Sequence, residues 1–223
     1  MYTWNWNVLL QYKQVLLQGA LATLWLTLFV VLLGTVLGIA IGLARRSETR
    51  LFSVAALAYT ELFRTLPILV LLIWVYYVAP LVIGIRFSAF TSAFFALSLN
   101  LSAFVAETVR AGIEAIPKHQ FESGVALGLK PHQVMRTIIL PQAFRNILPN
   151  LMGLYITQLK NSSLASVIAV NELLHVSNTI ISNTYRPLEV YTAVAVGYLV
   201  MILPFTLLAN KLEVVLKRTS KHV

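Results

Sequence analysis

Glu122-Ser-Gly-Val-Ala-Leu-Gly128, followed by nine residues and then by Ile138-Ile-Leu-Pro141, is the stretch from which the rest of this chain can be interpreted. It lies in a polar loop, about residues 112–141, between long apolar segments. Ser123 and Gly124 are small enough to allow a partner surface to approach closely. Gly128 suits a turn, because glycine adopts backbone angles that other residues avoid. The stretch predicts two short helices that dock onto a partner protein. The alternative is an amphipathic helix at a membrane interface with no partner.

The composition of the chain indicates a membrane protein. Hydrophobic residues make up 58% of the 223 residues and charged residues only 11%, whereas a soluble domain has about 25% charged residues. A helix that spans a bilayer needs about 20 mostly apolar residues. Five segments meet this requirement, at about residues 15–44, 52–82, 87–111, 144–170 and 190–213. We therefore expect residues 1–223 to form one all-α membrane domain, without room for a soluble catalytic domain.

Several kinds of chemistry lack the residues that they need. The chain has no cysteine and no aspartate, and it has no Gly-x4-Gly-Lys-Ser/Thr run to hold nucleotide phosphates. Its four histidines are scattered over loops and the C-terminal tail. We therefore expect no catalytic centre, no metal site and no cofactor bound by this chain.

The distribution of Lys and Arg predicts the orientation. With five spans, loops alternate between the two sides of the membrane, and cytoplasmic loops carry the excess of basic residues. We therefore expect a periplasmic N-terminus, a cytoplasmic C-terminus and a cytoplasmic Glu122 loop. The net charge of +9 then follows from topology, and nucleic-acid binding is not expected. One set of loops holds twelve basic residues, Arg45, Arg46, Arg50, Arg110, Lys118, Lys130, Arg136, Arg145, Lys211, Lys217, Arg218 and Lys221, and the other holds Lys13, Arg86 and Arg186.

Spacing within the spans predicts local contacts. Gly34, Gly38 and Gly42 recur once per helical turn, a pattern that lets membrane helices pack closely. Pro67 should break the second span, because it removes a backbone donor. Two charged pairs are spaced three residues apart, so each can form an ion pair on one helix face. These are Glu61 with Arg64 and Glu107 with Arg110.

Lys160 lies within the fourth span and needs a physical reason to be there. A charged lysine at a helix centre costs about 2.5–3.5 kcal/mol on insertion scales. Asn100 is a second polar group at comparable depth. The alternative is that Lys160 pairs with Glu107, or reaches toward the membrane surface, and only fixes packing. The candidate substrate-binding residues, which could hold an α-carboxylate and a polar side chain, are Asn100, Lys160, Asn161, Ser162 and Ser163.

Four motifs together resemble the permease subunits of ABC importers for polar amino acids, in the branch for histidine, glutamate, glutamine and arginine. They occur in the order of that family and span about half the chain. They are Glu61-Leu-Phe-Arg64-Thr-Leu-Pro67, the run from Asn100 to Gln120, the pattern from Glu122 to Pro141, and Lys160-Asn-Ser-Ser-Leu with its continuation to Glu172.

The resemblance implies a type I importer permease fold with five transmembrane helices and a cytoplasmic coupling helix. It implies a bacterial inner-membrane location and three kinds of partner. These are a second permease, identical or different, two ATPase subunits that carry ATP and magnesium, and a periplasmic substrate-binding protein. This chain would then be a transport subunit without catalytic activity, and the residues that contact the ATPase would be Glu122, Ser123, Gly124 and Gly128.

The pair Lys160-Asn161 bears on the substrate, because many relatives have Lys-Asp there. Without the carboxylate the lysine charge is not compensated locally, which favours binding a second negative or polar group. Glutamate, aspartate and glutamine are therefore favoured. The alternatives are a permease for basic amino acids and a secondary transporter, which would need no docking loop.

Overall fold

The computed structural model describes residues 2–220, with side chains described for residues 2–216. Within that range all regular structure is helical. Of the residues discussed above, the side chains of Lys217 and Arg218, and all of Lys221 and His222, lie outside the described part. The elements are α1 (Asn7–Gln11), α2 (Lys13–Ala44), α3 (Arg50–Thr65), α4 (Ile68–Ile73), the π-helical turn η1 (Trp74–Val78), α5 (Ala79–Ile83), α6 (Ala89–Glu114), α7 (Lys118–Ala126), α8 (Pro131–Val134), the π-helical turn η2 (Met135–Ile139), α9 (Leu140–Asn161), the 3-10 helix η3 (Ser162–Ile168), α10 (Leu173–Thr184) and α11 (Pro187–Ser220).

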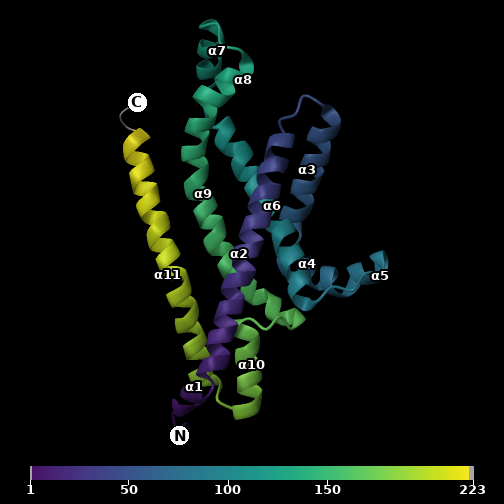
Figure 1. The fold of residues 1–223 in the computed structure, drawn as a ribbon, viewed down its shortest axis with the longest axis vertical. Coiled ribbons are helices and arrows are strands. Elements are labelled where there is room, and N and C mark those ends of the chain that lie inside the picture. The colour runs from purple at the N-terminus through teal and green to yellow at the C-terminus, as the bar shows by residue number, and fades with distance from the viewer. Residues whose placement is uncertain (1, 221–223) are drawn as a thin grey trace.

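The long helices α2, α6, α9 and α11 form an elongated bundle (Figure 1). The N-terminus and the C-terminal helix end lie at opposite ends of this bundle, and α7 and α8 project at the end where α11 finishes. The turn between α2 and α3 faces the same end as α7, whereas α1 and α10 lie at the other. This separation of the termini is the one that an odd number of membrane crossings requires.

Within the described part of the chain, three helices are long and apolar enough to cross a bilayer alone, namely α2, α6 and the Pro187–Leu216 part of α11. Two more crossings are available if each of two bent pairs counts as one span. The first pair joins α3 to Ile68–Ile83 with a bend of 103°, and the second joins Pro131–Ile168 to α10 with a bend of 46°. The second and fourth expected spans, 52–82 and 144–170, are thus discontinuous. The break at Pro67 was predicted, but the end of α9 at Asn161 was not.

Helices α2 and α6 make the most extensive contact in the bundle. A Cβ atom added to Gly38 would lie 2.5 Å from Val105, and one added to Gly42 would lie 2.8 Å from the backbone oxygen of Ala106. At Gly34 the nearest atom, in Leu101, would be 2.9 Å away. Such distances are too short for real Cβ atoms, so the three glycines set how near the helices lie. Their predicted role in packing is confirmed.

Helix α6 is the centre of the fold and α11 is peripheral. In the most apolar window of each helix, 61% of α6 is buried inside the chain but only 6% of α11. The start of α11 is held by the N-terminal segment instead. The Glu189 carboxylate accepts hydrogen bonds from the Tyr2 hydroxyl and, at 2.8 Å, from the Asn5 amide. Arg186 donates to the Thr3 carbonyl at 2.7 Å.

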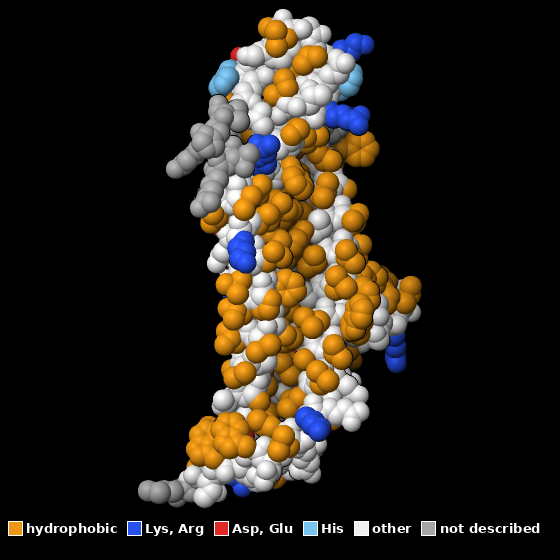
Figure 2. All heavy atoms as spheres, turned by 60° about the vertical axis from the view of Figure 1, so that its left-hand side comes forward, with side chains coloured by type: hydrophobic (Ala, Val, Ile, Leu, Met, Phe, Trp, Pro, Cys, Tyr) orange, Lys and Arg blue, Asp and Glu red, His pale blue; other side chains and the backbone are white. Residues whose placement is uncertain are grey.

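The outer surface matches an apolar surrounding. Figure 2 shows one face on which apolar side chains cover most of the length; Lys, Arg and His side chains lie at the α7–α8 end, and further single Lys and Arg side chains are scattered lower on the same face. Aromatic residues lie exposed at the other end, where the rings of Trp4 and Trp6 stack with their centres 5.2 Å apart. Tryptophan gathers at membrane–water interfaces, so this end has the composition of a headgroup region.

Candidate functional site

The first helix break lies between α3 and α4. Pro67 has no amide proton, so the carbonyl of Phe63, four residues earlier, loses its helical donor. Leu66 and Pro67 leave the helical conformation, with ψ angles of 129° and 128°. The Asn100 amide on α6 donates to the free Phe63 carbonyl at 2.8 Å and is only 6% exposed. Asn100 therefore satisfies the broken backbone, which is a different role from the substrate contact predicted for it.

The second break lies between α9 and α10. The chain leaves α9 after Asn161, forms the 3-10 helix η3, and turns at Ala169 with a positive φ of 59° before α10 begins. Lys160 is exposed in the last turn of α9, where a cation interacts favourably with the helix dipole. Among the described side chains Lys160 forms no ion pair. The alternative that it pairs with Glu107 is therefore wrong for this structure.

The polar residues after Lys160 divide into buried and accessible ones. Ser162 is fully buried, and its hydroxyl donates to the Leu159 carbonyl at 2.7 Å. Ser163 is half-buried and donates to the Lys160 carbonyl at 2.8 Å, and Asn161 is also half-buried. Of the predicted substrate residues, Lys160, Asn161 and Ser163 are thus accessible, whereas Asn100 and Ser162 face the interior.

The two breaks lie against each other beside α6. Helix α4, which follows the first break, contacts η3, and both contact α6. Leu72, Leu97 and Ile168 from these three elements belong to one buried apolar cluster. Non-helical backbone at membrane depth is tolerated where it is buried in protein or lines a water-filled cavity. This is therefore the place in the fold where a polar path is physically possible. No described contact joins Asn100 to Lys160, so the predicted residues do not close a pocket within one chain.

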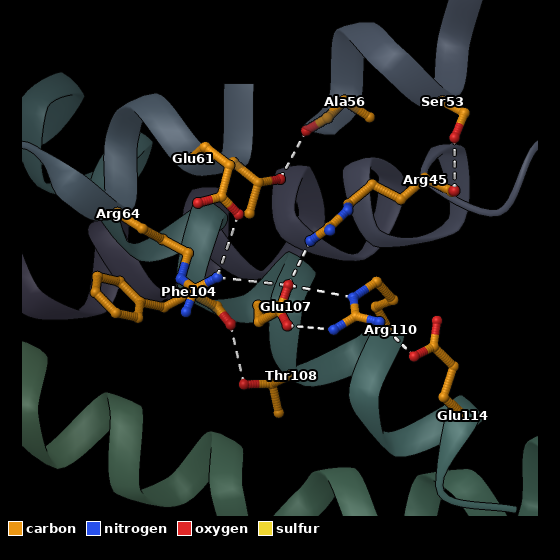
Figure 3. Close-up of polar contacts among 11 residues, drawn as sticks. Arg45, Ser53, Ala56, Glu61, Arg64, Phe104, Glu107, Thr108, Arg110 and Glu114 are labelled. Carbon is orange, nitrogen blue, oxygen red and sulfur yellow. Dashed lines mark hydrogen bonds and ion pairs between the residues drawn. The ribbon is translucent and has the colours of Figure 1, made fainter. Parts of the chain in front are cut away.

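A second polar centre surrounds Glu107 on α6 (Figure 3). Its carboxylate accepts hydrogen bonds from Arg45, the residue after α2, and from Arg110 on its own helix. Arg64 of α3 lies 3.5 Å from the same carboxylate. Two outer carboxylates complete the network, since Arg64 lies 3.7 Å from Glu61 and Arg110 bonds Glu114. We call these three arginines and three glutamates the Glu107 network. It ties the end of α2 to α3 and α6.

The Glu122 stretch forms a projecting helical turn, α7 followed by α8. Gly128 has a φ of +83°, and a Cβ atom there would have no neighbour within 4 Å. Gly128 is thus required by its backbone angle and not by crowding within the chain. A Cβ on Gly124, in contrast, would lie 2.8 Å from Val134, so its small size serves the packing of α7 on α8. Glu122 and Ser123 are exposed, and Leu127 at the tip is 81% exposed.

The second of the two expected short helices, α8, is not a separate helix. It continues through η2 into α9 without a break. The projecting turn is thus joined by continuous helical structure to α9, the helix that carries Lys160.

Comparison with known proteins gives the family. A model of the binding-protein-dependent transport system inner membrane component matches residues 31–219. The chain belongs to this family. The glutamine transport system permease protein GlnP of Escherichia coli is 34% identical over 210 residues, which is 94% of this chain and 96% of that protein.

Two solved structures show how closely the permease fold is kept. The first is an amino acid ABC transporter with histidines, which has a TM-score of 0.90 and 36% identity over 95% of this chain and 99% of the other. The second is the MetNI methionine ABC transporter in an inward-facing conformation, with a TM-score of 0.75 and 20% identity over 92% of this chain and 98% of that one. The likeness at 20% identity shows the fold alone. The predicted family and the type I permease fold are confirmed.

Three residues of this permease were missed by the sequence interpretation. Arg45 was counted only as a basic loop residue, although it binds Glu107 from 62 positions away. Glu172 was quoted only as part of a motif, and it is fully buried. Tyr198 was not mentioned, and it donates to Glu172 at 2.8 Å. An ionisable residue inside an apolar segment is a signal that could have identified Glu172. Among the described residues no group of three His, Cys, Asp or Glu side chains could hold a metal ion.

Proposed function

We propose that this chain is the membrane-spanning subunit of an ATP-driven, binding-protein-dependent importer of polar amino acids in the bacterial inner membrane. The observation that carries the proposal is the contact between the two helix breaks beside α6, on a chain of this transport family. It places two interrupted helices together at membrane depth, where a second subunit could complete a polar path, and the projecting α7 offers a surface for a partner that provides energy. One relative is named a glutamine transport permease, and the similar solved structure is named an amino acid ABC transporter with histidines. Both names support an amino acid as the substrate.

The proposed assembly contains a second permease subunit, two ATPase subunits that bind ATP and magnesium, and a periplasmic binding protein. Lys160, Asn161 and Ser163 are accessible on one chain but not enclosed by it. A second permease that faces them would complete the enclosure. In this assembly the N-terminus is periplasmic and the α7–α8 end is cytoplasmic, in agreement with the excess of Lys and Arg in the loops at that end. Closure of the ATPases would push on α7 and, through α8, on α9.

The substrate that this site favours is glutamine, glutamate or aspartate. Lys160 has no carboxylate partner among the described side chains, so its ammonium is available to a substrate carboxylate. Asn161, the neighbour of Lys160, offers an amide that can both donate and accept hydrogen bonds.

The test is uptake of radiolabelled glutamine into proteoliposomes that contain the chain with its ATPase subunits, with the binding protein added outside. Uptake should require both ATP inside and the binding protein. A matched complex with an ATPase variant that binds but does not hydrolyse ATP should show none. Glutamine uptake by the chain alone, driven by an ion gradient, would instead identify a secondary transporter and refute the proposal.

A further inference from the structure

Glu172 is a fully buried carboxylate at the second helix break. It precedes α10, and its two oxygens accept hydrogen bonds from the amides of Leu174 at 2.8 Å and His175 at 2.7 Å. These bonds cap the N-terminus of α10. No Lys or Arg pairs with Glu172 among the described ion pairs. Burying a carboxylate costs free energy unless it is hydrogen-bonded. The one further hydrogen bond to Glu172 therefore helps to stabilise the buried charge.

That contact is Tyr198 on α11. The Tyr198 hydroxyl donates to Glu172 at 2.8 Å, and the side chains of Thr23 on α2 and Ser163 on η3 lie near the same hydroxyl. Thr23 in turn accepts from the amide of Leu173 at 3.2 Å. One buried carboxylate thus connects the start of α10 to α11, at a tyrosine that lies close to Ser163 of the proposed substrate path, and the same start of α10 is bonded to α2 through Thr23.

The length of the side chain argues that this link does more than cap a helix. Aspartate, asparagine or serine is the usual N-cap residue, and each would satisfy the free amides of α10. A glutamate is long enough to bond the same amides and also to reach α11. Helix α11 has little other packing inside the chain, with 6% of its apolar window buried. At this end of α11, Tyr198 packs against an apolar cluster that includes Leu173 and Val194, and its hydroxyl adds a polar contact with Glu172 to that packing.

We propose that Glu172 is a positioning residue of the transport path, which acts through Tyr198 to hold Ser163 and η3 in the geometry that binds the substrate. This inference rests on the proposed function. It predicts that loss of the Tyr198 hydroxyl weakens substrate binding without reducing the amount of assembled transporter.

The test uses Tyr198→Phe, which keeps the ring and removes only the hydroxyl. The matched control is Tyr191→Phe on the same helix, where the hydroxyl donates to the exposed Asn178 at 3.1 Å. Binding of radiolabelled glutamine to the purified transporter, without the binding protein, gives the dissociation constant. Removing one hydrogen bond should raise it roughly two- to tenfold in Tyr198→Phe. The yield of assembled transporter should stay that of the wild type, and the unfolding temperature should fall because the buried Glu172 loses one partner. Tyr191→Phe should change neither glutamine binding, nor yield, nor the unfolding temperature.

Glu172→Asp separates positioning from capping. Aspartate can still cap α10 but withdraws the carboxylate from α11, so this variant should reproduce the weaker binding of Tyr198→Phe. The double variant should be no weaker than either single one, because both remove the same link.

Wild-type binding in both Tyr198→Phe and Glu172→Asp would overturn the inference, as would an equal loss of yield and binding. These outcomes differ from failure of the proposed function, which would appear as absent ATP-driven uptake in the wild type.

Discussion

At the scale of single residues, Glu107 takes part in more ion pairs than any other side chain described above. Three arginines from two helices and a helix end surround one carboxylate that is 23% exposed. Without that carboxylate their positive charges would face one another. Spacing along the chain predicted the bond to Arg110, three residues away. It could not predict Arg45, because the contact across 62 residues exists only once α2 and α6 are packed together.

Glu107→Gln should therefore destabilise the protein by about 2 kcal/mol, since it removes charged hydrogen bonds and leaves the arginines unpaired. Glu114→Gln is the control, because Glu114 is 51% exposed and bonds only Arg110 in the Glu107 network. It should change stability by less than about 0.5 kcal/mol. Thermal unfolding in detergent measures both variants. If Glu107→Gln and Glu114→Gln unfold at the same temperature, the Glu107 network does not hold the helices together.

Asn161 is the residue at which the substrate preference can be tested. Asn161→Asp places a carboxylate beside Lys160 and compensates its charge, so uptake of glutamate should fall relative to uptake of arginine. The measurement is uptake of both amino acids with the native binding protein present. Unchanged glutamate transport would exclude an electrostatic role for Asn161 and, with it, the acidic preference.

At the scale of elements, the two helix breaks differ in whether the sequence predicts them. Pro67 predicts the first break, because proline removes a backbone hydrogen-bond donor wherever it occurs in a helix. The second break contains neither proline nor glycine between Ser162 and Glu172. It depends on tertiary bonds, including those of Glu172, and apolar content alone continued the predicted span to residue 170.

The α7–α8 turn carries a prediction about coupling. Gly128→Asp should abolish transport while the protein remains in the membrane, because it adds bulk and charge at the surface proposed to meet the ATPase. Gly84→Asp is a matched control, since Gly84 has a similar φ of +73° and is equally open. It lies outside the α7–α8 turn and should leave coupling intact. Co-purification of the ATPase and uptake measure the result, and full uptake with Gly128→Asp would refute the docking assignment.

The glycine contact between α2 and α6 gives a second prediction at this scale. Gly38→Ala should destabilise the protein by about 1–3 kcal/mol, because the added methyl group overlaps Val105. Gly153→Ala on α9 is the control, since no atom lies within 4 Å of its Cβ position. Alanine should be neutral there or stabilising by up to about 1 kcal/mol. Unfolding temperatures compare the two, and equal shifts would contradict the packing role of Gly38.

At the scale of the whole molecule, composition and charge predicted an all-helical membrane domain, and the family comparison agrees with it. The enclosure of the path could not be predicted from one sequence. Within this chain Lys160 is exposed and α11 is barely covered, and in the proposed assembly a second permease and lipid would cover these surfaces. A residue whose partner lies in another subunit cannot be recognised from contacts within one chain.

The proposed orientation is testable with reporter fusions. Fusions at Ser47 and Arg136 should report the cytoplasm, and fusions at Ile83 and Thr184 should report the periplasm. The physical reason is the basic-residue excess at the α7–α8 end, which resists transfer across the membrane. A cytoplasmic signal at Thr184 would overturn the model of five crossings.

The glycine contact also has a mechanical meaning. Helices that touch backbone to backbone cannot slide or rotate past each other without separating first, and the Glu107 network fastens the same two helices at one end. Helices α2 and α6 should consequently move as one rigid body during a transport cycle. The conformational change of the transport cycle must then occur elsewhere, in the bent segments around Pro67 and η3. The hinges of the protein and its proposed substrate path would therefore be formed by the same few residues.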